Sequence, residues 1–123
     1  MMYSKKIMEL FRKPKNVGEI KNPSGKGKVG NPRCGDIMEV YIKVKDNKII
    51  NAKFKTFGCV AAIAASDALC EMIKGKTIEE AKKITNQDIV DYLHGMPQIK
   101  VHCSVLGKQA LDKAIKDYES KKK

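Results

Sequence analysis

The sequence lacks the features that would place it in a membrane, secreted or cofactor-bearing class. It contains no Trp and only 6% aromatic residues, and it has no apolar run of the roughly 18 residues that a transmembrane helix needs. Residues 1–13 have neither an apolar core nor a small-residue cleavage site, so they do not resemble a secretory signal. No flavin, nicotinamide or nucleotide motif is present. We therefore expect a cytoplasmic protein that is not an enzyme and does not contact a membrane.

The cysteines lack the paired spacing of the usual zinc sites. There are four, Cys34, Cys59, Cys70 and Cys103, and none forms a CxxC pair. In a reducing compartment, such residues are more often free thiols or metal ligands than disulfides. Cys70 lies in an apolar helical stretch and is predicted to be a core residue. The other three lie at junctions between predicted elements, which is where a metal site would be built.

Positive charge is abundant, but it is concentrated at the two ends of the chain. The 25 Lys and Arg outnumber the 14 Asp and Glu, which gives a formal charge of +11. Residues 1–33 hold nine basic residues against two Glu, whereas residues 34–103 hold ten against nine acidic residues. No aromatic residues alternate with the basic ones, as single-strand binding requires. A solvated lysine-rich surface is the preferred interpretation, and a nucleic acid is an unlikely partner.

The hydrophobic pattern predicts a single domain over residues 1–123 with an α+β fold. We expect a small antiparallel β-sheet of two to three strands, packed on one face by several helices. Alternating apolar residues predict strands over 36–45 and 48–57, joined by a turn at Asp46–Asn47. Predicted helices cover residues 4–12, 60–74, 77–83, 85–94 and 103–118. Residues 1–33 are expected to hold the first helix and a flexible, basic Gly/Pro-rich segment with a short edge strand at 17–21, and 119–123 a solvated tail.

The predicted topology brings candidate metal ligands together. Because antiparallel neighbours run in opposite directions, the start of strand 36–45 lies beside the end of strand 48–57, which places Cys34 and Cys59 at one sheet end. Cys59 and Cys103 each precede or begin a helix, where the helix dipole lowers a thiol pKa. Asp36 and His102 add oxygen and nitrogen donors. Three thiolates with a carboxylate and an imidazole suit iron–sulfur or zinc chemistry.

Three separated motifs carry a resemblance to a known family. They are Gly30-Asn31-Pro32-Arg33-Cys34-Gly35-Asp36, Lys55-Thr56-Phe57-Gly58-Cys59 followed by an Ala-rich stretch, and Lys100-Val101-His102-Cys103-Ser104. Together they resemble the IscU-type iron–sulfur cluster assembly scaffolds, which are related to the N-terminal domain of NifU. The resemblance implies a scaffold on which a transient 2Fe–2S cluster is built from iron and desulfurase-derived sulfur, then transferred to apo-proteins.

The resemblance also implies roles for individual residues. Cys34, Cys59 and Cys103 would be the principal ligands, with Asp36 and His102 as alternates. Either Cys103 or Cys34 would accept sulfur, and Zn²⁺ or Fe²⁺ could occupy the cluster-free form. The implied partners are a cysteine desulfurase, an electron donor such as a ferredoxin, and recipient apo-proteins.

One segment departs from the family pattern. The loop that an Hsp70-type chaperone grips reads Leu-Pro-Pro-Val-Lys in well-known members, whereas this chain has Met96, Pro97, Gln98, Ile99 and Lys100. The loss of one proline leaves the segment less committed to an extended conformation. This departure weakens the case for chaperone-assisted transfer.

Two other functions compete with the scaffold. The chain could be a zinc-binding sulfur acceptor that activates a desulfurase, as in the related SufU proteins, or less plausibly a structural zinc module that binds nucleic acid. SufU proteins carry an insertion between the second and third cysteines, and none is evident between Cys59 and Cys103. A stable electron-transfer centre would favour four firm thiolates, whereas three thiolates and an Asp favour a transient cluster.

Overall fold

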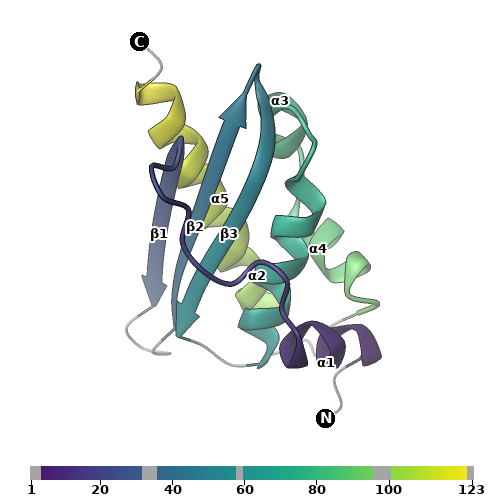
Figure 1. Cartoon of the computed structure of the whole chain (residues 1–123). Helices are drawn as coiled ribbons and strands as arrows, with labels where there is room; N and C mark the ends of the chain where they lie inside the picture. Colours follow the sequence, from purple (N-terminus) through teal and green to yellow (C-terminus); the bar gives the residue numbers. More distant parts are fainter. Residues whose placement is uncertain (1–3, 32–35, 58–59, 96–100, 122–123) are drawn as a thin grey trace.

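A computed structural model describes residues 4–31, 36–57, 60–95 and 101–121 of the chain. Three strands form one sheet, and five helices lie on one side of it or at its end (Figure 1). The elements in chain order are α1 (Lys5–Arg12), β1 (Gly25–Asn31), β2 (Asp36–Lys45), β3 (Lys48–Phe57), α2 (Val60–Ile73), α3 (Ile78–Lys82), α4 (Asn86–Tyr92) and α5 (Val101–Lys121). The predicted α+β class is confirmed.

The sheet has the order β1-β2-β3, and both pairs of neighbours are antiparallel. The predicted hairpin of β2 and β3 is confirmed with the expected bounds. Asp46 and Asn47 have φ values of 53° and 64°, the left-handed conformations that a tight two-residue hairpin turn requires. Asp and Asn tolerate this region better than other non-glycine residues, which is why the turn falls here.

Strand β1 corrects the prediction of a flexible loop before Cys34. It pairs along its whole length with β2, from Gly25↔Ile42 to Asn31↔Asp36. The glycines that made it look like a loop are required by packing, because α5 lies directly on this strand. A Cβ at Gly27 would lie 2.1 Å from the carbonyl oxygen of Ala110. The edge strand expected at 17–21 is reduced to a single bridge between Val17 and Phe54.

The helix ends follow the local signals in the sequence. Ser4 caps α1: its Oγ accepts from the Ile7 N–H at 3.1 Å and donates to the carbonyl oxygen of Leu93. The capping boxes at Thr77 before α3 and at Thr85 before α4 are both present. The last helix is longer than predicted at both ends, since α5 runs from Val101 to Lys121.

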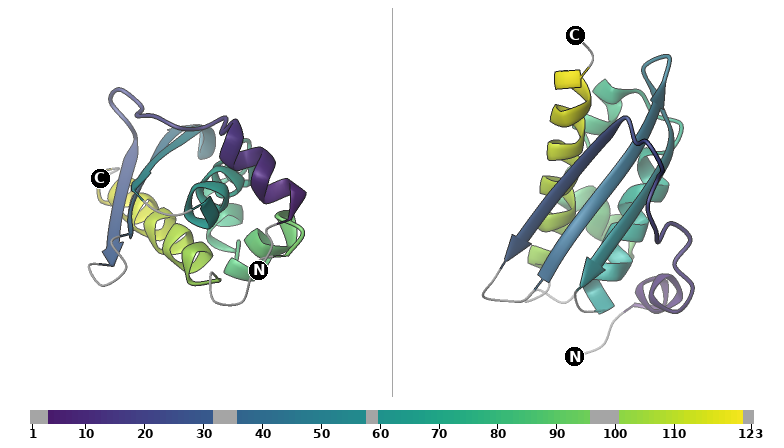
Figure 2. Two further views of the ribbon diagram at one scale, coloured as in Figure 1. Left: turned by 90° about the horizontal axis from the view of Figure 1, so that it is seen from below. Right: turned by 60° about the vertical axis from the view of Figure 1, so that its left-hand side comes forward.

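The two views of Figure 2 show helices covering one face of the sheet. The buried residues of the core come from this face of the sheet and from the helices. Met38, Val40, Ile42 and Phe54 point inward from β2 and β3, and each is at most 1% exposed. Helix α2 is buried over most of its surface, as its sequence rich in Ala, Ile, Leu and Met predicted. Cys70 is fully buried in this helix and its thiol is free, which confirms the core assignment. Burial raises the pKa of the Cys70 thiol far above its ordinary value.

Among the helices in the described ranges, none is both long and apolar enough to cross a membrane. The longest helix, α5, has 21 residues, but charged and polar side chains make up nearly all of its exposed side. Its buried residues, including Leu106, Ala110, Leu111, Ala114 and Ile115, face the sheet and the neighbouring helices. The length of α5 therefore allows it to pack against β1 and β2 of the sheet and against α2 and α4.

Substitution of Gly27 by Ala tests the close contact between β1 and α5. The new Cβ would meet the Ala110 carbonyl oxygen at 2.1 Å and the Ala114 nitrogen at 2.5 Å, and backbone atoms cannot move aside cheaply. We expect Gly27→Ala to lower the free energy of unfolding by about 3 kcal/mol, at the upper end of overpacking effects, as measured by urea unfolding.

Gly107→Ala is the matched control, because a Cβ there would meet only side-chain atoms at 3.6 Å, an ordinary contact. This exchange should leave the free energy of unfolding unchanged or raise it by up to about 1 kcal/mol, since Ala favours a helix interior over Gly. Equal stability of the Gly27→Ala protein and the wild type would show that α5 does not rest on β1 as described.

Candidate metal centre

The ends of the three strands that flank the cysteine motifs meet at one end of the sheet. Asn31, the last residue of β1, is the register partner of Asp36, the first residue of β2. Phe57, the last residue of β3, is the partner of Ile37. The last residue of β1, the first residue of β2 and the last residue of β3 therefore lie at the same end of the sheet, which is the lower end in Figure 1. We call this end of the sheet, together with the first turns of α2 and α5, the ligand end.

Helix α5 runs back along β1 and begins at the ligand end. A Cβ on Gly25 would touch the carbonyl oxygen of Ala114, and one on Gly27 would touch that of Ala110. Strand β1 and helix α5 therefore run antiparallel, and the end of β1 at Asn31 lies toward the first residue of α5. His102 and Cys103 lie in this first turn, whose backbone the structure places at the ligand end.

Helix α2 also begins at the ligand end, directly after β3 (Figure 1). Neither α2 nor α5 has an acidic residue in its first turn. No carboxylate from their own first turns therefore offsets the positive ends of the two helix dipoles. Such an environment favours thiolates and other anionic groups at this end of the molecule.

The predicted site residues differ in what the structure says of them. Cys34, Cys59 and the loop residues Met96, Pro97, Gln98, Ile99 and Lys100 lie outside the described residues. Asp36, His102 and Cys103 are placed by their backbone alone, at the start of β2 and of α5. Among the side chains within the described ranges, no group of three or more His, Cys, Asp or Glu could hold a metal ion.

The interior next to the ligand end is apolar and tightly filled. The buried Met38 follows Asp36 by two residues in β2, and its sulfur accepts a hydrogen bond from the Ser66 hydroxyl at 3.2 Å. The side of α5 at Gly107 lies close to the Met38 sulfur and to a methyl group of Leu69. At the surface, Ile37 and Val105 remain 37% and 36% exposed. The described side chains next to the ligand end are thus mostly buried and apolar, with Ile37 and Val105 partly exposed at the surface.

One buried carboxylate was missed by sequence reasoning. Asp67 lies in the middle of α2 and is fully buried. Its Oδ1 accepts from the backbone N–H of Lys15 at 3.0 Å, and from the backbone N–H and the side-chain amide of Asn16 at 2.9 Å each. The second carboxylate oxygen is buried and has no hydrogen-bond partner among the described residues. An acidic residue inside an otherwise apolar helix is the only signal the sequence offered.

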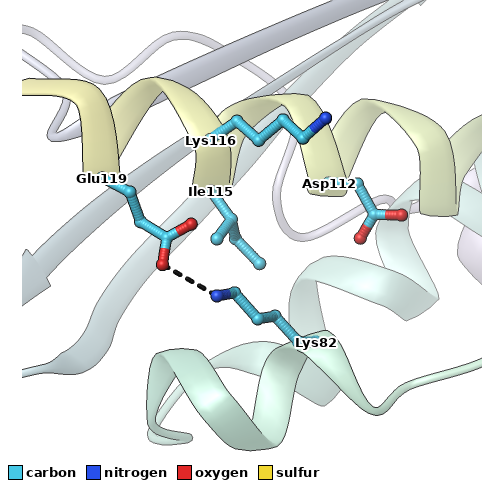
Figure 3. A pocket seen from close by; sticks show the side chains of 5 residues that line it. All are labelled: Lys82, Asp112, Ile115, Lys116 and Glu119. Carbon is cyan, nitrogen blue, oxygen red and sulfur yellow. Dashed lines mark hydrogen bonds and ion pairs between the residues drawn. The ribbon is translucent and has the colours of Figure 1, made fainter.

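A charged pocket between α3 and the C-terminal half of α5 is a poorer candidate for a functional site than the ligand end. It is lined by Lys82, Asp112, Ile115, Lys116 and Glu119 (Figure 3). Three of its four charged side chains are paired: Lys82 donates to Glu119 at 2.7 Å, and Lys108 beside the pocket donates to Asp112 at 3.0 Å. It has no thiol, hydroxyl or imidazole in its lining that could ligate a soft metal or act as a nucleophile.

Comparison with known proteins places the chain in a family. The family model described as the NifU-like N-terminal domain matches residues 2–123. The chain belongs to this family. The match covers all the described elements, including β1 and the N-terminal arm, by which we mean residues 4–24 before this strand.

Individual relatives agree with this membership. The chain is 56% identical over 117 residues to the iron–sulfur cluster assembly scaffold protein IscU 1 of Archaeoglobus fulgidus, covering 95% of this chain and 76% of the relative. It is 46% identical over 126 residues to IscU of Escherichia coli K12, covering 99% of this chain and 98% of the relative. A crystal structure of a candidate scaffold of the SUF system from Fervidobacterium islandicum superposes with a TM-score of 0.77 at 25% identity, covering 92% of this chain and 96% of the other.

The buried Asp67 gives this NifU-like domain a pH dependence that can be measured. Burial is the main cause that raises the pKa of Asp67 above 3.8, and the hydrogen bonds from Asn16 and Lys15 oppose it. A carboxyl with a raised pKa in the folded state favours folding when protonated, and this contribution is lost as pH rises through the raised pKa. We expect the stability of the wild type relative to Asp67→Asn to fall with rising pH above about 4 and then level off.

Urea unfolding of the two proteins at a series of pH values measures this difference. Asp67→Asn keeps an acceptor oxygen for the N–H groups and cannot ionise, so it isolates the ionisation from the hydrogen bonds. A wild-type advantage that grows as the pH rises would show that the native state prefers the ionised carboxylate, contrary to this account.

Proposed function

We propose that this protein is a scaffold on which a transient 2Fe–2S cluster is assembled from iron and desulfurase-derived sulfur and then passed to apo-proteins. The observation that supports it most is the convergence of three motif-bearing segments on one end of the fold. Family membership and relatives named as iron–sulfur cluster assembly scaffolds support the same function. In this proposal the cluster is cargo, and the protein does not turn over a substrate of its own.

The ligand roles follow from donor chemistry. Cys34, Cys59 and Cys103 supply thiolates, which bind iron of a cluster firmly. Asp36 and His102 supply a carboxylate and an imidazole, which are harder donors that exchange more readily in a sulfur-rich site. The first turns of α2 and α5, free of acidic residues, favour the thiolate forms of the adjacent cysteines. In the cluster-free form, the same donors suit Zn²⁺ or Fe²⁺.

Sulfur delivery is a thiol–persulfide exchange. The thiolate of Cys103 or Cys34 attacks the outer sulfur of the desulfurase persulfide, the sulfur–sulfur bond of the donor breaks, and the desulfurase cysteine leaves as a thiolate. The sulfur then carried must gain two electrons to become sulfide. Because the chain has no flavin or nicotinamide motif, an external electron donor such as a ferredoxin supplies them.

Release depends on the incomplete thiolate set. A cluster held by three thiolates and one harder donor can be attacked by the thiols of a recipient at its weakest bond, so it moves by ligand exchange. A centre built for permanent electron transfer would favour four thiolates. Chaperone assistance at residues 96–100, including Lys100, stays weakly supported because this segment has one proline where well-known members have two.

The zinc-dependent activator is the second candidate. The likeness to a SUF-system protein favours it, since that structure matches nearly its whole length. Against it, helices α2, α3 and α4 fill the interval between residues 60 and 92 with short connections, as expected for a chain without the SufU-type insertion. The two candidates predict different products when the protein is incubated with iron and a desulfurase.

Anaerobic reconstitution with ferrous iron, cysteine, a cysteine desulfurase and a reductant separates these functions. We expect visible charge-transfer absorption with iron and acid-labile sulfide in equal amounts. The absorption should be lost in Cys34→Ala, Cys59→Ala and Cys103→Ala, because each removes a thiolate, whereas Cys70→Ala should retain it because Cys70 is buried in the core. A colourless protein with one tightly held zinc that only stimulates the desulfurase would support the activator.

Asp36→Ala tests the exchangeable ligand. Removing the carboxylate takes away a donor through which iron enters and leaves, so the assembled cluster should persist several-fold longer in the presence of a chelator. The decay of the visible absorption after chelator addition measures this lifetime. Faster decay in Asp36→Ala than in the wild type would mean that the carboxylate holds the cluster and does not aid its release.

A further inference from the structure

Residues 15–18, in the segment before β1, form a clamp between strand β3 and helix α2. Asn16 is 1% exposed, and its backbone carbonyl oxygen accepts from the Phe54 N–H of β3 at 2.9 Å. Gly18 donates to the carbonyl oxygen of Phe54 at 2.9 Å. On its other side, Asn16 donates through its backbone and side-chain amides to Asp67 of α2. A single buried asparagine thus joins the edge of β3 to the middle of α2.

The two elements joined by this clamp are those on either side of Gly58–Cys59. Strand β3 ends at Phe57 and helix α2 begins at Val60. Phe54 lies three residues before the end of β3, and Asp67 lies two turns into α2. Fixing the distance between Phe54 and Asp67 therefore fixes the relation between the two ends to which the Cys59 segment is attached.

The burial of the Asp67 carboxylate lowers stability, and this points to a positioning role for the residue. Its Oδ2 is buried without a hydrogen-bond partner among the described residues, which lowers the stability of the fold. Its Oδ1 accepts from the backbone N–H groups of Lys15 and Asn16 and from the Asn16 side-chain amide, which also donates to the Asp67 carbonyl oxygen at 3.4 Å. A neutral apolar residue would pack in the helix without this penalty, but it would leave the N–H groups of Lys15 and Asn16 without an acceptor.

Helix α1 is anchored by its own buried residues, so the clamp matters chiefly for residues 15–18, which follow this helix. Ile7 and Leu10 are the buried residues of α1, and this helix is too short to be stable when detached. Val17, next to the clamp, is 51% exposed and adds little burial. The polar contacts of Asn16 with Asp67 and Phe54 therefore account for much of the order in residues 15–18.

We infer that Asp67 is a positioning residue for the ligand end: through Asn16 it clamps α2 to the edge of β3, and closure of the clamp and metal binding at the cysteines favour each other. The inference rests on the proposed function, because it takes Cys59 as a ligand. The coupling is reciprocal by linkage: metal binding tightens the clamp by the same factor by which closure of the clamp strengthens metal binding. A substitution that opens the clamp can therefore weaken metal binding by up to this factor.

The test compares Asp67→Ala, which removes the acceptor, with Asp67→Asn, which keeps an acceptor oxygen, and with Asn16→Ala. Ile49→Val is the control, because it removes a buried methyl group beside the β2–β3 turn, at the opposite end of the sheet from the ligand end. Zinc affinity of each metal-free protein is measured by competition with a chromophoric chelator. Hydrogen exchange of the Phe54 amide is followed by NMR with and without zinc.

We expect Asp67→Ala to weaken zinc binding about fivefold or more, within the usual range of coupling, and Asn16→Ala to weaken it less. Asp67→Asn and Ile49→Val should bind zinc within about twofold of the wild type. The Phe54 amide, which contacts Asn16 and not Asp67, should exchange about tenfold faster in Asp67→Ala, because both halves of the clamp open together. Zinc should slow this exchange in the wild type and much less in Asp67→Ala.

Two results would overturn the inference while leaving the scaffold proposal intact. One is equal zinc affinity in the wild type and Asp67→Ala, and the other is unchanged Phe54 exchange in Asp67→Ala. If the wild type bound no zinc and assembled no cluster, the proposed function would fail, and the coupling would fail with it. Metal binding by the wild-type protein distinguishes the two cases: it is present if only the coupling fails and absent if the proposed function fails.

Discussion

The contact between the backbone of α5 and the glycines of β1 is the constraint on which the rest of the structure depends. Gly25 and Gly27 leave no side chain between strand and helix, so that α5 lies directly on the sheet. This contact sets the direction and the depth of α5, and with them the place of its first turn. His102 and Cys103 belong to that turn, so the packing at Gly27 helps to bring a motif from the end of the chain to the ends of the strands.

Prediction from sequence worked where one local signal decided the structure. The alternation of Met38, Val40 and Ile42 fixed the face of β2, and the capping boxes at Thr77 and Thr85 fixed the starts of α3 and α4. It was wrong for β1, because Gly25 and Gly27 have poor strand propensity and their role depends on a helix some 85 residues later, an example of tertiary packing that overrides local preference.

The ligand residues of the candidate site stay a prediction from sequence, whereas the packing beside the site comes from the structure. Cys34, Cys59 and Cys103 were chosen because they lie at junctions and within motifs, and the described strand and helix ends meet where that choice requires. The clamp of Asn16 and Asp67 had no such signal, because a buried pair between a loop and a helix interior follows no sequence period. Its existence depends on how the arm crosses the edge of β3, which only the three-dimensional structure shows.

The central claim is that the ligand end holds an iron–sulfur cluster only until a recipient takes it. Incubation of the ⁵⁵Fe-loaded protein with an excess of an apo-ferredoxin, followed by separation of the two proteins, measures this most directly. The account predicts that the iron moves to the ferredoxin together with sulfide and that ferredoxin spectra appear at the same rate. Iron that stays with this protein, or that reaches the ferredoxin only after free iron appears in solution, would contradict it.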